Sequence, residues 1–139
     1  RFCDEEMLKR FERFQLIRDY VSQRQVEVDE ENRVKKIDTT QIVNGRRLTN
    51  VGTFRAYVVA YLRSHPRIHQ DMTFLVRHRA PTPQGLPLEI YVFTTTIVWA
   101  EYEGIQSDIF DHLLAAVPRF GLKVFQEPTG AELGQALSA

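Results

Sequence analysis

The stretch PLEIYVFTTTIVWAEYEGIQSDIFDHLLAAVPRFG, residues 87–121, decides the fold, because its hydrophobic period changes part-way along. Its first ten residues are rich in β-branched and aromatic side chains, which are typical of a strand. After Glu101 the apolar residues recur in steps of three and four, which predicts a helix with one apolar stripe: Tyr102, Ile105, Ile109, Leu113 and Val117. Such a stripe must be buried against a partner, and the nearest partner is the preceding strand.

The helix is expected to end near its proline and glycine. Pro118 kinks or ends a helix, and Gly121 suits the left-handed position just beyond a helix C-terminus. Residues 122–126 are then expected to form a short strand, which Pro128 stops. Residues 131–139 are expected to be a tail.

The residues before this unit predict a hairpin and two further helices. Residues 72–80 alternate between apolar and polar, and the turn at 81–85 makes them the antiparallel partner of the strand after Pro87. Thr49 or Asn50 caps a helix that stops before Pro66, with the stripe Val51, Phe54, Tyr57, Val58, Tyr61 and Leu62.

The N-terminal third predicts a long helix followed by an irregular segment. Asp4 is a good N-cap for a helix over about residues 4–25. Residues 26–45 are strongly polar, and we interpret them as a linker or a mobile insertion. Two short strands, 33–37 and 40–43, are an alternative for that segment.

From Thr49 onward the order is α-β-β-α-β, which with one leading strand is the ferredoxin-like α+β sandwich. Residues 1–3 are candidates for the end of that strand, most of which is truncated. We therefore divide the chain into an N-terminal helix and insertion (1–47), a ferredoxin-like domain (48–130) and a tail (131–139). A missing strand leaves a sheet edge unpaired, so we expect residues 26–43 to fill the gap or strands to pair between chains.

Composition limits the classes of function. The 139 residues carry 18 basic and 18 acidic side chains, so the chain has no general attraction for nucleic acid or anionic lipid. A single cysteine, Cys3, allows no internal disulfide and lacks the His and Asp context of a nucleophile. No apolar run approaches the roughly 20 residues that span a bilayer. The chain starts at Arg1 rather than Met, which suggests a fragment of a longer protein.

Several motifs together resemble one channel family. They are LTNVGTFRAY (48–57), HPRI (65–68), the stretch containing Trp99, Gln106 and Asp108, and Gly121 with Leu122. Over about residues 48–130 the chain resembles the C-terminal cytoplasmic domain of the mechanosensitive channels of small conductance. It is most similar to the larger bacterial inner-membrane branch that carries an insertion in this domain, which the first helix matches.

The resemblance implies a non-enzymatic part of a channel, with no cofactor. Members are homo-oligomers, typically heptamers, with upstream transmembrane helices in the inner membrane and this domain on the cytoplasmic side. There it shapes a cage through which ions and small solutes pass, helps the ring to assemble and modulates gating during osmotic stress. The alternative is a small-molecule-binding regulatory domain of the same fold, and a third hypothesis is an enzyme that uses the acidic helix.

Two groups of side chains are candidates for functional surfaces. One is the acidic helix face, which we interpret as solvated and, in a ring, as facing the side portals: Glu101, Glu103, Asp108 and Asp111. The other is an aromatic group near the strand-to-helix corner, for which core packing and an inter-subunit contact are both open: Trp99, Tyr91, Phe93 and Phe125.

Metal and RNA sites are disfavoured. His65 and His69 are four apart, but Pro66 stands between them, and no cysteine or carboxylate has a recognisable ligand spacing with the four histidines. The basic run Arg77-His78-Arg79 lacks the aromatic, glycine-containing motif of RNA-recognition modules.

Overall fold

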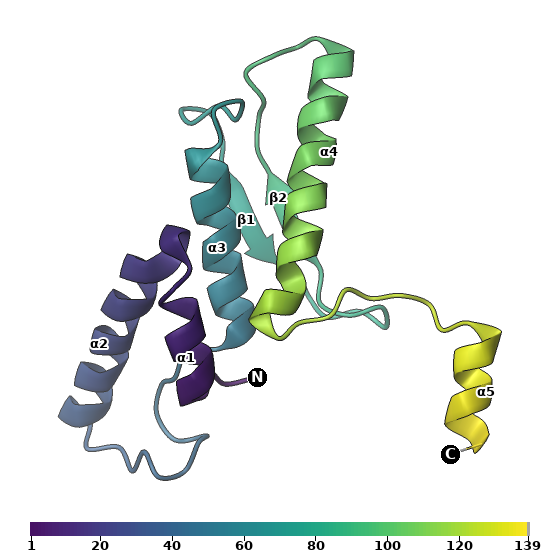
Figure 1. Ribbon diagram of the computed structural model, residues 1–139. Helices are drawn as coiled ribbons and strands as arrows, with labels where there is room; N and C mark the ends of the chain where they lie inside the picture. Colours follow the sequence, from purple (N-terminus) through teal and green to yellow (C-terminus); the bar gives the residue numbers. More distant parts are fainter. Residues whose placement is uncertain (139) are drawn as a thin grey trace.

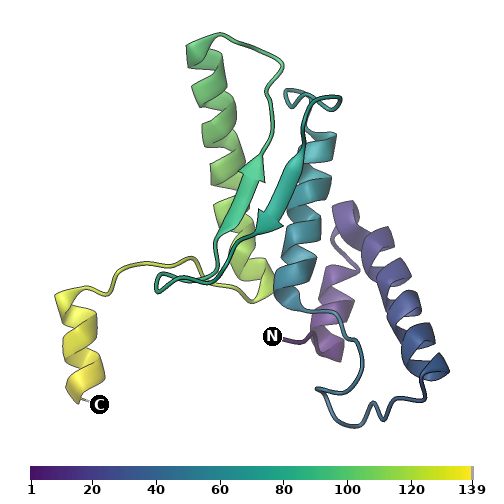
Figure 2. The ribbon, with the colours of Figure 1, turned by 180° about the vertical axis from the view of Figure 1, so that it is seen from behind.

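The computed structural model describes residues 1–138, and its central layer is the predicted hairpin with two helices on one face. Strand β1 (Leu75–His78) pairs antiparallel with β2 (Leu88–Tyr91), so that Val76 lies opposite Ile90. Helices α3 (Asn50–Ser64) and α4 (Trp99–Ala116) lie side by side on one face of this sheet, and both views leave the other face uncovered (Figures 1 and 2). The fold class is therefore α+β, with a single two-stranded sheet in the described residues.

The predicted helix boundaries and stripes of α3 and α4 are confirmed. Thr49 caps α3 by accepting a hydrogen bond from the Gly52 N–H, and the helix ends one residue before His65. The predicted stripe is buried at three positions on α4 and at Val117 in the turn that follows, whereas Tyr102 is exposed. Pro118 ends α4 in the 3-10 turn η2 (Val117–Phe120), and Gly121 adopts the left-handed conformation with φ +69°.

The hairpin is confirmed but shorter than predicted. Beyond Tyr91 the chain leaves β1, because Phe93 and Thr95 exchange hydrogen bonds with His69 and Arg67 instead. The turn closes through reciprocal backbone hydrogen bonds between Thr82 and Gly85.

The prediction of one N-terminal helix over 4–25 is wrong. The chain forms α1 (Glu5–Phe11), a 3-10 turn η1 (Gln15–Ile17) and α2 (Arg18–Val34), which runs through residues predicted as linker or strand. The break lets Phe14 turn inward, where its ring packs edge-on against Phe120 with centroids 5.3 Å apart. We call residues 1–47 the arm.

The loop that closes the arm is anchored rather than free, and the predicted strands 33–37 and 40–43 are absent from it. The side chain of Asn32, which is 7% exposed, brackets Arg46 by donating to its carbonyl oxygen (2.8 Å) and accepting from its N–H (3.0 Å). Gly45 has φ +67°, and a Cβ there would lie 2.4 Å from the Asn32 Oδ1. Position 45 of the Asn44-Gly45 turn therefore requires glycine.

The arm does not fill the sheet gap as one alternative predicted. Residues 26–43 lie beyond α3, on the side away from β2 (Figures 1 and 2). Phe2 instead forms an isolated antiparallel bridge with Thr49, outside the sheet. Residues 122–126 are also not a strand, because they have no neighbouring strand to pair with.

The core joins the arm to the sheet-covering helices through Phe120. This side chain is 1% exposed, and its ring lies 5.2 Å from the centroids of Phe11, Phe54 and Tyr57. Those three partners come from α1 and α3, so arm and domain share one aromatic cluster.

The predicted tail is a helix, α5 (Gly130–Ser138), which lies apart from the rest of the molecule in both views. Within residues 1–138, no helix combines the length and apolar character needed to cross a bilayer.

Candidate functional site

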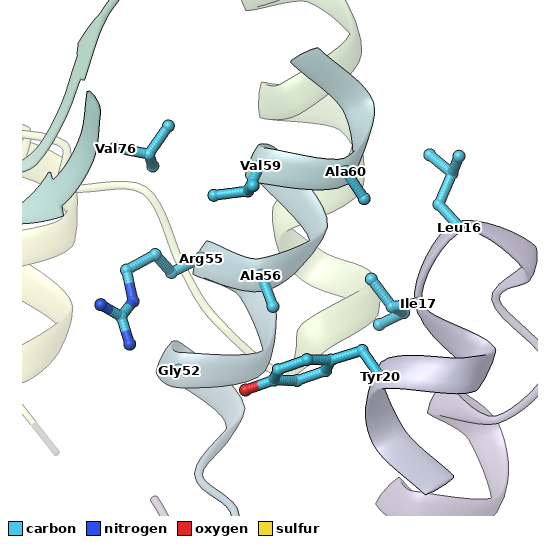
Figure 3. Close-up of a pocket in the computed structure, with 9 residues that line it drawn as sticks. All are labelled: Leu16, Ile17, Tyr20, Gly52, Arg55, Ala56, Val59, Ala60 and Val76. Atoms are coloured by element: carbon cyan, nitrogen blue, oxygen red, sulfur yellow. The ribbon is translucent and has the colours of Figure 1, made fainter. Parts of the chain in front are cut away.

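Two concave surfaces lie on opposite flanks of the domain. The first, which we call the arm groove, runs between η1–α2 and α3 and encloses about 380 Å³ (Figure 3). Its floor is α3, its walls are Leu16 and Tyr20 from the arm and Val76 from β1, and Arg55 stands at the β1 side. Arg55 is the one charged residue among those lining the groove.

The second surface, the sheet-edge groove, lies between β2, α4 and the segment after Gly121, and encloses about 590 Å³. Its lining is mostly apolar, with Leu88 and Ile90 on one side and Leu122 and Phe125 on the other. The Arg79 N–H bonds to the Pro87 carbonyl oxygen, so alternation along the antiparallel ladder turns the backbone groups of Leu88 and Ile90 away from β1. This edge of β2 therefore presents unpaired strand groups toward an apolar groove.

His78 lines the sheet-edge groove in an unusual state. Neither ring nitrogen is solvent-exposed, and neither makes a hydrogen bond of standard geometry among the described residues, although the Val51 backbone lies close enough to act on the ring. Burial, with help from the nearby Arg55 charge, lowers the pKa of His78 below its ordinary value.

The four acidic side chains of α4 are not brought together. Glu101 is engaged by the Arg67 guanidinium at 3.2 Å and by the Thr96 hydroxyl at 2.6 Å. Glu103, Asp108 and Asp111 are exposed, and no ion pair within residues 1–138 involves them. The four are spread over about 15 Å of helix, so they make a charged face rather than a pair of catalytic carboxylates.

The four candidate aromatic residues are also dispersed. Tyr91 and Phe93 pack edge-to-face with centroids 5.6 Å apart, and Trp99 contacts Tyr102 at 6.2 Å. Trp99 is 74% exposed, so it is not a core residue of this chain. Phe125 lies at the sheet-edge groove instead.

An aromatic–imidazole cluster on the α3–α4 seam was not predicted. The His112 ring stacks on Tyr61 with centroids 4.2 Å apart, and its Nε2 lies 2.7 Å from the Tyr57 hydroxyl oxygen. Burial raises the pKa of both tyrosines, and the Asp108 charge adds to the shift of Tyr61. Tyr57 and Tyr61 are four residues apart, so the sequence indicates that they share a helix face. Their partner His112 belongs to α4, and the sequence does not show that the two helices pack together there.

The remaining candidate ligands do not converge. Among the described residues no three His, Cys, Asp or Glu side chains are grouped to hold a metal ion. Burial raises the pKa of the Cys3 thiol, which lowers its thiolate fraction at neutral pH.

Comparison with known proteins identifies the family. The family described as "Mechanosensitive ion channel MscS, C-terminal" matches residues 50–124. The chain belongs to this family. The matched residues run from the start of α3 to the segment after Gly121, and so include the lining of the sheet-edge groove except Phe125. The MscS family is named for an ion channel and not for an enzymatic activity.

One curated relative of this MscS domain is the low conductance mechanosensitive channel YnaI of Escherichia coli strain K12. The two are 31% identical over 87 residues, which cover 63% of this chain. The chain spans 25% of the length of YnaI. No solved structure matches the chain.

Proposed function

We propose that the chain is the cytoplasmic module of a tension-gated ion channel in a bacterial inner membrane. The observation that carries this proposal is the family match over residues 50–124. The 31% sequence identity with a channel named mechanosensitive supports it. In this proposal the domain performs no chemistry. It acts by being repeated around the axis of a pore, where it stabilises the ring, shapes the cytoplasmic vestibule for ions and small solutes, and modulates gating during osmotic stress.

The groove beside β2 supports the finer proposal of a ferredoxin-like sandwich. One more strand would fit antiparallel between β2 and residues 122–125, where the backbone groups of Leu88 and Ile90 await a partner. Arg1 lies beside residues that adjoin the groove lining: its backbone carbonyl oxygen accepts from the Asn50 N–H, next to Val51, and its guanidinium approaches Gly121, next to Leu122. A segment preceding Arg1, or a strand of another copy, could therefore complete the sheet of the domain that we place at 48–130.

Exposed aromatic residues support assembly between copies. Trp99 is 74% exposed at the start of α4, and Tyr91 lies on the uncovered face of the sheet. Aromatic side chains of this kind are enriched at the centres of protein interfaces. We propose that these two residues contact a neighbouring subunit in a homo-oligomer, for which the family resemblance implies a heptamer.

The chain contains a single tryptophan, which makes assembly directly measurable. The complete protein is purified in detergent micelles, and its mass is measured by light scattering. The emission of Trp99 is isolated by subtracting the spectrum of the Trp99→Phe variant, and is then compared between the complete protein and this domain alone. We expect a closed ring of identical subunits and a blue-shifted Trp99 emission in the ring. A monomeric complete protein would overturn the proposal.

The sheet-edge groove also favours one second function. Its volume of about 590 Å³ and its apolar lining are typical of small-molecule sites. A regulatory ligand there would add about 2.7 kcal/mol to the free energy of unfolding at 100 times its dissociation constant, and would therefore raise the melting temperature in a thermal-shift screen. His78→Leu would be expected to alter that response, because His78 lines the groove.

A further inference from the structure

Helix α5 is encoded in the sequence but does not pack on the rest of the described chain in either view. Thr129 and Glu132 form a reciprocal capping box: the Thr129 N–H donates to the Glu132 carboxylate (2.7 Å), and the Glu132 N–H donates to the Thr129 hydroxyl (3.2 Å). The helix nevertheless lies away from the domain, and Leu137 is 88% exposed. A helix of nine residues is only marginally stable alone in water, so it needs a surface to pack against.

The arm groove has the shape of a seat for a helix. Its floor is Gly52, Ala56 and Ala60, which recur every four residues along α3 and let another backbone approach closely. Leu16 and Tyr20 rise on one side of this floor (Figure 3). A docked helix would thus have small residues beneath it and apolar side chains along its flank.

The charges of the groove and of α5 are complementary. Arg55 is the one charged group lining the groove, and no ion pair or hydrogen bond within residues 1–138 engages its guanidinium. The segment from Val124 to the end of the sequence has no Lys or Arg and carries two acidic residues, Glu127 and Glu132. An acidic, partly apolar helix is the occupant that such a groove favours.

We propose that α5 of one copy docks in the arm groove of a neighbouring copy, with Leu137 against the Ala56–Ala60 floor and a carboxylate of α5 or its linker facing Arg55. This inference rests on the proposed function, in which copies surround one axis. The arm and α5 lie on opposite flanks of the chain, with α3 and α4 between them in both views. A contact between opposite flanks is heterologous, and contacts of that type form rings when the rotation between copies closes and open filaments when it does not.

The first test is binding of a peptide to a chain that lacks α5. Every core residue precedes Gly121 in the described structure, so a chain ending at Pro128 keeps its core. A fluorescent peptide of residues 126–139 is titrated with this truncated chain, and anisotropy is measured. We expect saturable binding. Binding sites in a ring are tethered at millimolar effective concentration, so absence of binding at about 1 mM would overturn the proposal.

Variants locate the site. Peptide carrying Leu137→Asp is expected to bind at least tenfold more weakly, and chains with Ala60→Trp or Arg55→Glu several-fold more weakly. Arg13→Glu is the matched control, because Arg13 is exposed on the arm but does not line the groove. Circular dichroism checks that each variant is folded. Equal affinity for the Arg55→Glu, Ala60→Trp and control chains would contradict the assigned groove.

Disulfide trapping tests whether docking occurs between copies. In a Cys3→Ser background, complete protein carrying Ala60→Cys is mixed and co-assembled with complete protein carrying Leu137→Cys, and then oxidised. We expect cross-linked dimers. A chain carrying both substitutions is oxidised in parallel. Cross-linking within that chain, with no cross-linked dimers in the mixture, would overturn docking between copies. Tension-gated current from the complete protein is recorded in parallel. If the current is present but no α5 contact is detected, this inference is rejected and the proposed function still stands.

Discussion

The ring of Phe120 stacks on the ring of Phe11, with centroids 5.2 Å apart and planes inclined by 28°. The two residues are separated by most of the chain, and both are fully buried. Phe11 belongs to the arm, and Phe120 ends the turn η2 that follows α4. This contact therefore joins a segment outside the family match to the matched residues 50–124. The arm is therefore an integral part of the folded unit.

Replacing either ring should destabilise the whole chain. Phe120→Ala and Phe11→Ala are each expected to lower the free energy of unfolding by about 3–5 kcal/mol, because each removes a buried aromatic ring. The double variant should reveal a coupling of about 0.5–1.5 kcal/mol from the stacked pair. Urea unfolding followed by far-UV circular dichroism measures these values. Two separate transitions in the unsubstituted chain would show that arm and domain unfold independently.

Asn50 is the second tie between distant segments. Its Nδ2 donates to the carbonyl oxygens of Phe120 (3.0 Å) and Gly121 (3.3 Å), and the side chain is 1% exposed. Asn50→Leu leaves these carbonyl groups without their donor, so we expect a loss of about 1–3 kcal/mol in the free energy of unfolding. Gln41→Ala, on the exposed arm loop, is the control and should change stability little. Equal stability of the two variants would refute the role of Asn50.

His78 should make stability depend on pH. Its pKa is lowered in the folded state, so the unfolded chain binds the proton more readily. The contribution of His78 to the free energy of unfolding is therefore fully present above its unfolded pKa of about 6.5. It is lost as the pH falls toward the lowered pKa of the folded state. His78→Leu should flatten this decline between pH 7 and 5, because leucine carries no titratable group. Unfolding curves of both chains across this range measure the effect, and parallel pH profiles would be inconsistent with it.

The exposed acids of α4 should bias ion passage in the complete channel. Neutralising Glu103, Asp108 and Asp111 to Gln or Asn is expected to lower the cation-to-anion permeability ratio, because the proposed ring would repeat these charges around the vestibule. The reversal potential in a potassium chloride gradient measures that ratio. The matched control neutralises the same number of exposed acids on the arm: Glu6, Glu12 and Asp19. An unchanged reversal potential in the α4 variant would argue against portal-facing charges.

The spacing of apolar residues correctly predicted the helices whose buried faces can be recognised from their own sequence. The stripes of α3 and α4 and the left-handed Gly121 follow from residue spacing and backbone chemistry. The break after Phe11 was missed because Phe14 and Ile17 continue the helical spacing, and only packing on Phe120 shows where the chain turns. Residues 122–126 have strand-forming side chains, but a strand also requires a neighbour, which no local pattern supplies.

Two misassigned segments did carry a readable signal. The end of α2 contains ion pairs at helical spacing, Glu30 with Arg33 and Glu31 with Lys35, which indicate helix rather than linker. Residues 129–132 form the Ser/Thr-x-x-Glu pattern that starts α5. The Tyr61–His112 stack, by contrast, joins two helices and could only be found once their packing was known.

The most direct test of the central claim is the current of the complete protein under membrane tension. The gene is expressed in bacteria that lack their own mechanosensitive channels, and excised patches are stretched by suction. We predict discrete channel openings whose probability rises with tension, and altered gating when the domain is destabilised by Phe120→Ala. Protein that is present in the inner membrane as an intact ring but passes no tension-dependent current would contradict the account.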